Sequence, residues 1–264
     1  MTAEASDDPA ARSSGGVQSL DRAFAILEAM ADAGGVIGLS QLAEKADLPL
    51  ATIHRLVRTL VNLGYVRQED SRQYSLGPQL MRLSGTASKR VRVWTRSAMS
   101  AAVAELGESV NLAILDADEI VYVAQVQPSA NFMRMFTEVG FRTAPHATAV
   151  GKAILADFPE ADVVALLGRT GMQRHTDRTL VTPQDFLTEL AEVRRLGYAI
   201  DDGEQEIGVR CIGVAVPDTP QPMALSMSGP STRVDDELVK RAHQVLSEAA
   251  TEICAVLSRT GSGA

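Results

Sequence analysis

Cysteine, tryptophan and long apolar runs are all scarce in this chain of 264 residues. Its two cysteines, Cys211 and Cys254, are too few for a disulfide framework and cannot form a thiolate metal site alone. This low cysteine content suits a reducing compartment, and we expect a cytoplasmic protein. No uncharged apolar run approaches the ~18 to 20 residues that cross a bilayer, and residues 1–16 are small and acidic rather than basic and then apolar. We therefore expect neither secretion nor membrane insertion.

Positive charge is also in deficit, because the net charge of the whole chain is -8. Binding to nucleic-acid phosphates needs Lys and Arg, so the local distribution matters more than the total. From Thr52 to Arg82 five arginines stand against two acidic residues, and residues 87–97 hold four basic residues and no acid. This asymmetry predicts that one end of the chain faces a polyanion while the remainder repels it. A basic face that only meets solvent is the alternative.

The length favours two domains over one large one, and the ordinary content of 45% hydrophobic residues allows each a core. The first sixteen residues lack periodic apolar positions and are predicted to be a disordered leader. We place the boundaries at 1–16 for the leader, 17–78 for a first domain, 79–94 for a connector helix, 95–258 for a second domain and 259–264 for a flexible tail.

Apolar spacing in the first domain predicts three helices followed by a hairpin. The first helix starts near Leu20 and stops at Gly34, and a short second helix has Ser40 as its N-cap. A turn at Asp47 to Pro49 leads to a third helix whose apolar stripe runs from Ile53 to Leu60. Short strands at 65–67 and 73–76 complete the pattern. The order of helix, helix, tight turn, helix and hairpin is typical of a winged helix-turn-helix.

The exposed face of the third helix carries the residues that we expect to contact DNA. In a helix-turn-helix, side chains near the start of the second helix reach base edges in the major groove, and a bidentate Arg distinguishes guanine. Arg55 is the predicted base reader, and Arg58 lies further along, where the DNA backbone is reached. For His54 the alternative is a solvent-exposed histidine that makes no specific contact with DNA. The predicted DNA-binding residues are Ser40, Ala51, Thr52, His54, Arg55, Arg58, Arg67 and Arg72.

The second domain alternates strands with helices around a central sheet, which predicts an α/β or α+β fold. After a helix over 79–97, a hairpin is expected from strands at 111–115 and 120–126, with a third strand at 132–139. Further strands are expected at 198–201, 209–216 and 223–228, and helices at 147–156, 160–167, 182–196 and 234–257. Thr182 as cap and Pro183 in the first turn mark the start of one helix.

Enzymatic and metal-binding patterns are incomplete. Lys152 does not belong to a phosphate loop, because His146 stands where such a loop needs glycine and Ala153 replaces the hydroxyl residue that binds magnesium. A nucleophile set of Cys211, Asp201 and His146 can be imagined, but any chain with a few such residues offers one. The four histidines show no metal-ligand spacing, and His175 is interpreted as surface loop. We expect no catalytic residue, no metal and no cofactor.

Several motifs together resemble the IclR family of bacterial transcriptional regulators. In the first domain these are Val17-Gln18-Ser19-Leu20-Asp21-Arg22-Ala23, Leu48-Pro49-Leu50-Ala51-Thr52-Ile53-His54-Arg55-Leu56 and Tyr74-Ser75-Leu76-Gly77-Pro78. In the second they are Pro145-His146-Ala147-Thr148-Ala149-Val150-Gly151-Lys152-Ala153, Gly208-Val209-Arg210-Cys211-Ile212-Gly213 and Ser226-Met227-Ser228-Gly229-Pro230. The resemblance runs from about residue 17 to 257. It departs at Leu50, where the family often has a basic or polar residue.

The resemblance implies an α+β chain with a winged helix-turn-helix domain, a connector helix and a GAF-like α/β effector-binding domain. It also implies an effector pocket with an apolar wall and a polar side. Ser226 and Ser228 alternate on a strand, so both hydroxyls face one side, as binding to a carboxylate requires. The alternative is a solvated sheet face. The predicted effector residues are Phe132, Met135, Ala149, Val150, Gly151, Asp201, Val209, Cys211, Ser226 and Ser228.

We therefore expect a ligand-responsive regulator that binds double-stranded operator DNA as a homodimer or a dimer of dimers. The predicted function is repression of a catabolic operon, released or modulated by a small carboxylate such as glyoxylate, pyruvate or a ureide-type metabolite. Two alternatives remain open on the sequence: an enzyme acting on a small keto acid or ureide, and an architectural DNA-binding protein without an effector.

Overall fold

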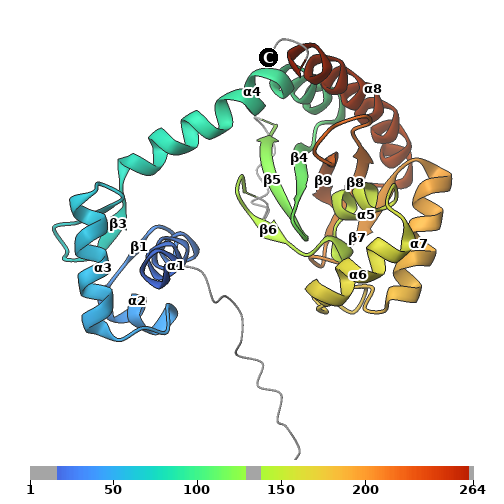
Figure 1. Cartoon of the computed structure of the whole chain (residues 1–264). Helices are drawn as coiled ribbons and strands as arrows, with labels where there is room; N and C mark the ends of the chain where they lie inside the picture. The colour runs from blue at the N-terminus through green and yellow to red at the C-terminus, as the bar shows by residue number, and fades with distance from the viewer. Residues whose placement is uncertain (1–16, 129–137, 262–264) are drawn as a thin grey trace, which may run out of the picture. The chain divides into compact units, whose positions relative to one another are not determined.

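The computed structural model describes residues 17–128 and 138–261, and its internal contacts divide the chain into two compact units, residues 1–87 and 88–264 (Figure 1). Phe132 and Met135 lie outside the described residues, and so does most of the predicted strand at 132–139. Val139, at the end of that stretch, lies in a turn. Among the described residues, every helix is too short or too polar to span a bilayer.

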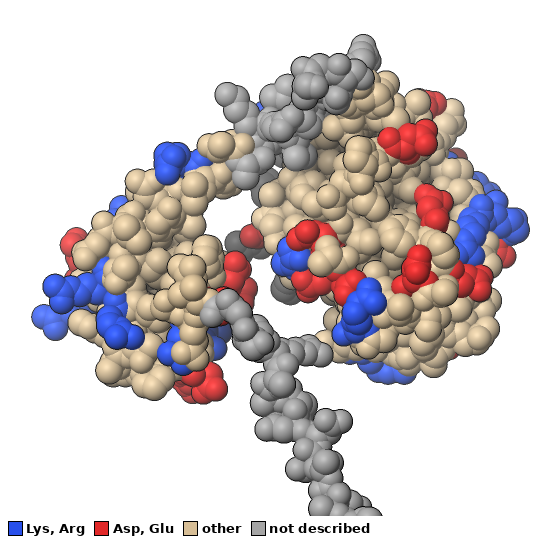
Figure 2. Space-filling model, in the orientation of Figure 1, with Lys and Arg blue, Asp and Glu red and all other residues tan. Residues whose placement is uncertain are grey.

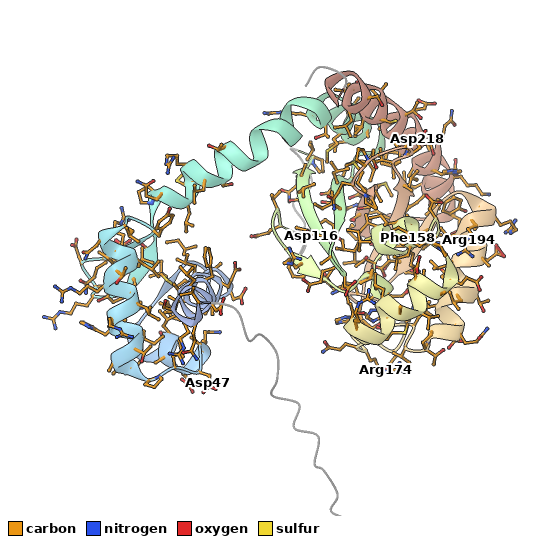
Figure 3. All side chains as sticks on the ribbon, in the orientation of Figure 1. Asp47, Asp116, Phe158, Arg174, Arg194 and Asp218 are labelled. Carbon is orange, nitrogen blue, oxygen red and sulfur yellow. The ribbon has the colours of Figure 1, made fainter. Side chains whose placement is uncertain are left out.

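The first unit has the predicted order of helices and hairpin. Its apolar stripes converge on one core that includes Ile26, Leu42 and Ile53, all fully buried. Asp47 adopts a left-handed backbone (φ 48°) in the tight turn between α2 and α3, a conformation that Asp tolerates better than most residues; it is labelled in Figure 3. The elements are α1 (Gln18–Asp32), β1 (Val36–Ile37), α2 (Leu39–Lys45), α3 (Leu50–Asn62), β2 (Val66–Gln68) and β3 (Tyr74–Leu76).

Strand β1 was not predicted, because two residues are too few to show alternation. It pairs with β3, which also pairs with β2, so an antiparallel sheet of order β1-β3-β2 forms. The N-cap prediction for Ser40 was wrong. Gly38 is the N-cap of α2, and Gln41 Oε1 accepts a hydrogen bond from its N–H at 3.3 Å, so Ser40 lies inside the helix.

Helix α4 (Pro78–Leu106) is longer than the predicted helix, which ended at Ser97. Its last turns carry Ala98, Met99, Ala102 and Leu106, which are buried against the sheet of the second unit. Tertiary packing therefore extends the helix to Gly107, whose backbone at φ +73° terminates it.

The second unit is built on a six-stranded antiparallel sheet of order β6-β5-β4-β9-β8-β7. The predicted hairpin at Asp116 to Glu119 is confirmed, and β6 is a further two-residue strand that the sequence did not show. The strands are β4 (Ser109–Asp116), β5 (Glu119–Val126), β6 (Arg142–Thr143), β7 (Ala199–Asp202), β8 (Val209–Ala215) and β9 (Met223–Pro230).

Helices cover both faces of this sheet (Figure 1). The end of α4 and the long α8 (Asp236–Gly261) pack on one face around Leu112, Leu225 and Met227. The opposite face packs against α5 (Ala149–Leu155), α6 (Glu160–Thr170) and α7 (Pro183–Leu196), which follow a 3-10 turn at Pro145–Ala147. Thr182 is the N-cap of α7, as predicted, and accepts a hydrogen bond from the Asp185 N–H.

Helix α7 is also tied to the segment that follows α5. Arg194 donates hydrogen bonds to the carbonyl oxygens of Ala156 at 2.6 Å and Phe158 at 3.4 Å, and both Arg194 and Phe158 are labelled in Figure 3. These contacts fix the C-terminal end of α5, so its N-terminal end is held against the sheet at a defined place.

Candidate functional site

Helix α3 presents a polar and basic face to solvent, as the sequence predicts. Ile53, Val57 and Leu60 are buried, and the predicted contact residues lie on the other side of the helix. Ala51, His54, Arg55 and Arg58 are exposed and Thr52 is partly exposed. Figure 2 shows basic side chains gathered on this unit. The first turns of α3 therefore expose polar and basic side chains on one face of the helix.

The wing gives its two predicted arginines different surroundings. Arg67 on β2 pairs with Glu69 at 2.8 Å, and Ser75 donates a hydrogen bond to the same carboxylate oxygen. The Ser75 hydroxyl, and then Arg67, lower the pKa of Glu69 below its usual range. Arg72 sits at the tip of the hairpin with φ +63°, and no ion pair of Arg72 occurs in the part of the chain that the structure describes. Arg72 is therefore the more available cation of the two.

A cavity of about 50 Å³ opens in the second unit between the start of α5, the sheet and the loop after β7. It has polar groups from three adjacent strands, because Asp201 on β7 is paired with Cys211 on β8, which is paired with Ser228 on β9. Directly paired residues project from the same face of a sheet, and Ser226 follows two positions away on that face. The residues around the cavity are Tyr122, Phe141, Thr143, Thr148, Ala149, Val150, Asp201, Gln205, Glu206, Val209, Cys211, Ser226 and Ser228.

Gly213 lets α5 approach the sheet at the cavity, and Gly151 lets α5 approach the 3-10 turn that precedes it. A Cβ at Gly213 would lie 2.5 Å from the carbonyl oxygen of Ala149, and one at Gly151 would lie 2.2 Å from that of Pro145. Thr148 caps the helix, since its Oγ1 accepts a hydrogen bond from the Gly151 N–H at 3.1 Å. The predicted helix start at this point is confirmed, but the Gly151 amide is already used by the cap and Gly151 does not line the cavity.

Asp201 is the buried acidic residue of the cavity, which Glu206 also lines, and Asp201 is 4% exposed. Its Oδ1 accepts hydrogen bonds from the backbone N–H groups of Glu204 at 2.7 Å and Gln205 at 3.4 Å. Burial dominates over these favourable bonds and raises the pKa of Asp201 to about 7. Asp201 thus shapes the loop after β7 and can hold a proton near neutral pH.

Cys211 is poorly suited to nucleophilic chemistry. Burial, and then the neighbouring Asp201, raise the pKa of its thiol far above the usual value. The thiolate is the nucleophilic form, so a thiol that keeps its proton is unreactive. This electrostatic setting argues against the thiol-enzyme alternative.

Lys152 was not predicted to have a role, yet it anchors the loop over the cavity. Its side chain is 0% exposed, and Nζ lies 2.6 Å from Glu204 and 3.0 Å from Glu189. The Glu204 carbonyl also accepts a hydrogen bond from Thr179 Oγ1 at 2.7 Å. Removing one partner of a buried ion pair costs about 3–5 kcal/mol, so this contact holds the loop firmly.

The histidines are closer than their sequence spacing indicates. The rings of His146 and His175 stack at 5.9 Å, and His146 Nε2 lies 2.9 Å from the carbonyl oxygen of Gln173. His175 is exposed, as predicted. Within the described ranges no group of three metal-ligating side chains occurs.

The structure brings together seven of the predicted effector residues: Ala149, Val150, Asp201, Val209, Cys211, Ser226 and Ser228. Sequence reasoning missed Tyr122, Phe141, Thr143, Thr148, Gln205 and Glu206 on the same wall. Thr148 could have been found, because a Thr directly before the start of a helix is a preferred N-cap residue. Gln205 and Glu206 lie in an irregular loop, which shows no periodic pattern.

A winged helix-turn-helix with a basic exposed face, followed by a separate unit with a small cavity that carries polar groups, defines a DNA-binding regulator that responds to a small molecule. The family comparisons agree with this class. Residues 19–70 match the IclR helix-turn-helix domain, and residues 85–255 match the C-terminal domain of bacterial IclR transcriptional regulators. The chain belongs to the IclR family and is a transcriptional regulator rather than an enzyme.

Individual proteins match over nearly the whole chain. The transcriptional repressor IclR of Escherichia coli is 34% identical over 250 residues, covering 92% of this chain and 91% of that protein. The acetate operon repressor of Salmonella typhimurium is 34% identical over 246 residues, covering 90% of this chain and 89% of that protein. A solved IclR regulator from Alicyclobacillus acidocaldarius, 26% identical, superposes with a TM-score of 0.81 over 92% of this chain and 99% of that one. The Thermotoga maritima IclR structure, 27% identical, superposes with a TM-score of 0.74 and covers 91% of this chain and 98% of that one.

Proposed function

We propose that this regulator represses a catabolic operon in the cytoplasm and that a small organic acid such as glyoxylate, pyruvate or a ureide-type metabolite releases or modulates it. The observation that carries the effector part is the polar row of Asp201, Cys211 and Ser228 in a small cavity. One water needs roughly 10–15 Å³, so a cavity of about 50 Å³ suits a compact molecule rather than a large one. Relatives named as repressors, including the acetate operon repressor, support the sign of the response.

The proposed effector contacts combine hydroxyl donors with apolar walls. Ser226 and Ser228 offer hydroxyl groups to a carboxylate, Ala149, Val150 and Val209 supply apolar surface, and Asp201 can donate its proton to a ligand oxygen when it is neutral. A hydrogen bond between a carboxylic acid and a carboxylate is stronger than one between neutral groups.

The proposed DNA complex contains at least two copies of the chain. One recognition helix reads only a few base pairs, so a dimer on two symmetric half-sites is needed for useful affinity. We propose a homodimer or a dimer of dimers on a near-palindromic operator, with Arg55 as the base reader and Thr52, Arg58 and Arg72 among the supporting contacts.

Replacement of Arg55 by Ala tests the DNA contact. We expect the affinity difference between operator and unrelated DNA to shrink by about 1–3 kcal/mol, because one bidentate base contact is lost. Mobility shifts on the DNA upstream of the chain's own gene measure it. Arg174→Ala, which removes an exposed arginine of the second unit (Figure 3), is the matched control and should leave discrimination unchanged. Unaltered discrimination in Arg55→Ala would exclude Arg55 as the base reader.

A panel of small acids tests the effector. Thermal shift and operator mobility shift are measured with glyoxylate, pyruvate and allantoate, and with 4-hydroxybenzoate as a larger acid. We expect a compact acid to raise the melting temperature and to change operator binding. If no acid does either while operator binding persists, the chain is an architectural DNA-binding protein and the effector proposal fails.

A further inference from the structure

Asn111, on β4, is fully buried beside the cavity without lining it. It is paired directly with Ser226 across the strands, and with Gln125 on its other side. A buried amide must find partners for both its donor and its acceptor, so the identity of these partners fixes how it is turned.

The Asn111 amide group is fixed in one orientation by a chain of hydrogen bonds. Gln127 Nε2 donates to Gln125 Oε1 at 3.0 Å, and Gln125 Nε2 donates to Asn111 Oδ1 at 2.9 Å. Asn111 Nδ2 then donates to Ser226 Oγ at 3.4 Å and to Ser228 Oγ at 3.2 Å. Every hydrogen bond in this series runs from Gln127, just after β5, toward the cavity.

The direction of the chain decides what the two serines can do. A serine hydroxyl has one proton and two lone pairs, and here Asn111 occupies a lone pair on each oxygen. Both hydroxyl protons are left to donate elsewhere. Ser228 is paired directly with Cys211, whose sulfur is at most a weak acceptor that a carboxylate oxygen can replace. The Ser226 proton has no protein acceptor among the described residues.

We propose that Asn111 is a positioning residue that sets both serine hydroxyls as donors, so that the cavity selects a ligand offering hydrogen-bond acceptors, that is, a carboxylate. The proposal rests on the proposed effector function and adds the source of its specificity. The preference for an acid over its neutral amide is then fixed by a residue that does not touch the ligand. A wrong ligand leaves a buried donor unpaired, which costs more than the bond itself gains.

Asn111→Asp is the direct test. The carboxylate still accepts a hydrogen bond from Gln125, but it lacks the NH₂ group that donates to the two serines. The serine hydroxyls then donate to Asp and present only lone pairs to the ligand. Binding of the best acid from the panel and of its amide, such as pyruvate and pyruvamide, is measured by calorimetry. We expect wild type to favour the acid at least tenfold, and the variant to lose or reverse this ratio with operator binding retained.

A second variant covers the case in which a buried Asp prevents folding. Gln125→Glu leaves Asn111 in place but removes the donor to its Oδ1, so the amide turns its NH₂ group toward Glu and its oxygen toward the serines. The same reversal of the ratio is expected. Gln184→Glu on α7 is the matched control: it adds the same charge at an exposed position outside this series of hydrogen bonds, and it should keep the wild-type ratio.

The outcomes separate the two proposals. An unchanged ratio in Asn111→Asp or Gln125→Glu, with acids still bound, overturns the role of Asn111 and leaves the effector proposal standing. An equal loss of the ratio in Gln184→Glu assigns the effect to charge alone and also overturns it. If wild type binds neither acids nor amides, the effector proposal itself fails.

Discussion

At the scale of single residues, Asp201 combines a structural and a chemical task. Its side chain accepts two backbone N–H groups of the loop over the cavity and yet stays protonated to about pH 7, because burial penalises its charge. In the unfolded chain an Asp has a pKa of about 3.9, so the folded form binds the extra proton between these values.

This difference predicts how stability changes with pH. Below about pH 4 the raised pKa of Asp201 does not lower the free energy of unfolding, because Asp201 is protonated in both the folded and the unfolded chain. The free energy of unfolding falls as pH rises from about 4 to about 7. Asp201→Asn removes the effect, so we expect the stability of this variant relative to wild type to increase between pH 4 and pH 8 by roughly 2–4 kcal/mol. Urea unfolding at both pH values measures it. Asp177→Asn, at an exposed loop position, is the control, and a parallel change in both variants would refute the assignment.

At the scale of elements, the seating of α5 on the sheet decides whether the cavity exists. The helix start lies against the backbone of β8, and only residues without a Cβ fit at Gly151 and Gly213. Its other end is held by Arg194 from α7, and Lys152 joins it to the loop after β7. One short helix therefore brings two of the cavity walls together.

Glycine substitutions test this packing. Gly213→Ala and Gly151→Ala place a methyl group within 2.5 Å and 2.2 Å of carbonyl oxygens, so the backbone must move. We expect each to lose about 1–3 kcal/mol of stability, typical of overpacking, and to weaken binding of the acid. Gly168→Ala in α6 has open space at its Cβ and should instead be neutral or stabilising by up to ~1 kcal/mol. Thermal unfolding compares the three, and equal effects would contradict the close approach.

At the scale of the whole molecule, the two units are connected by the continuous helix α4, which begins after the wing and ends at the strand that carries Asn111. Glu108, between α4 and β4, forms a two-point ion pair with Arg233 at 2.6 and 2.9 Å, just beyond β9 with its two serines. The end of α4 is thus fastened to the elements that form the polar wall of the cavity.

Linkage gives a quantitative prediction for the complete chain. If the acid weakens operator binding by some factor, the operator must weaken acid binding by the same factor. We expect a factor of about 5 to 150, which corresponds to ~1–3 kcal/mol of coupling. Titration of the acid with and without operator, and of operator with and without acid, gives both values. The Ser226→Ala, Ser228→Ala double variant should show neither effect, and a factor of one in wild type would mean that acid binding and operator binding are not coupled.

Local patterns were sufficient for much of this description. The helix-turn-helix, the exposed arginines of α3, the cap at Thr182 and the shared face of Ser226 and Ser228 all follow from spacing of 3.6 or 2 residues and from capping chemistry. These features depend on neighbours in the sequence, so the sequence alone determines them.

Only the tertiary structure decided which distant groups meet. Asn111 lies more than a hundred residues before the serines that it orients, Lys152 finds its acidic partners on α7 and in an irregular loop, and α4 extends past Ser97 because its last turns bury an apolar stripe. Strand register and packing bring these groups together. Contacts between residues far apart in the sequence depend on the global fold, so local periodicity cannot predict them.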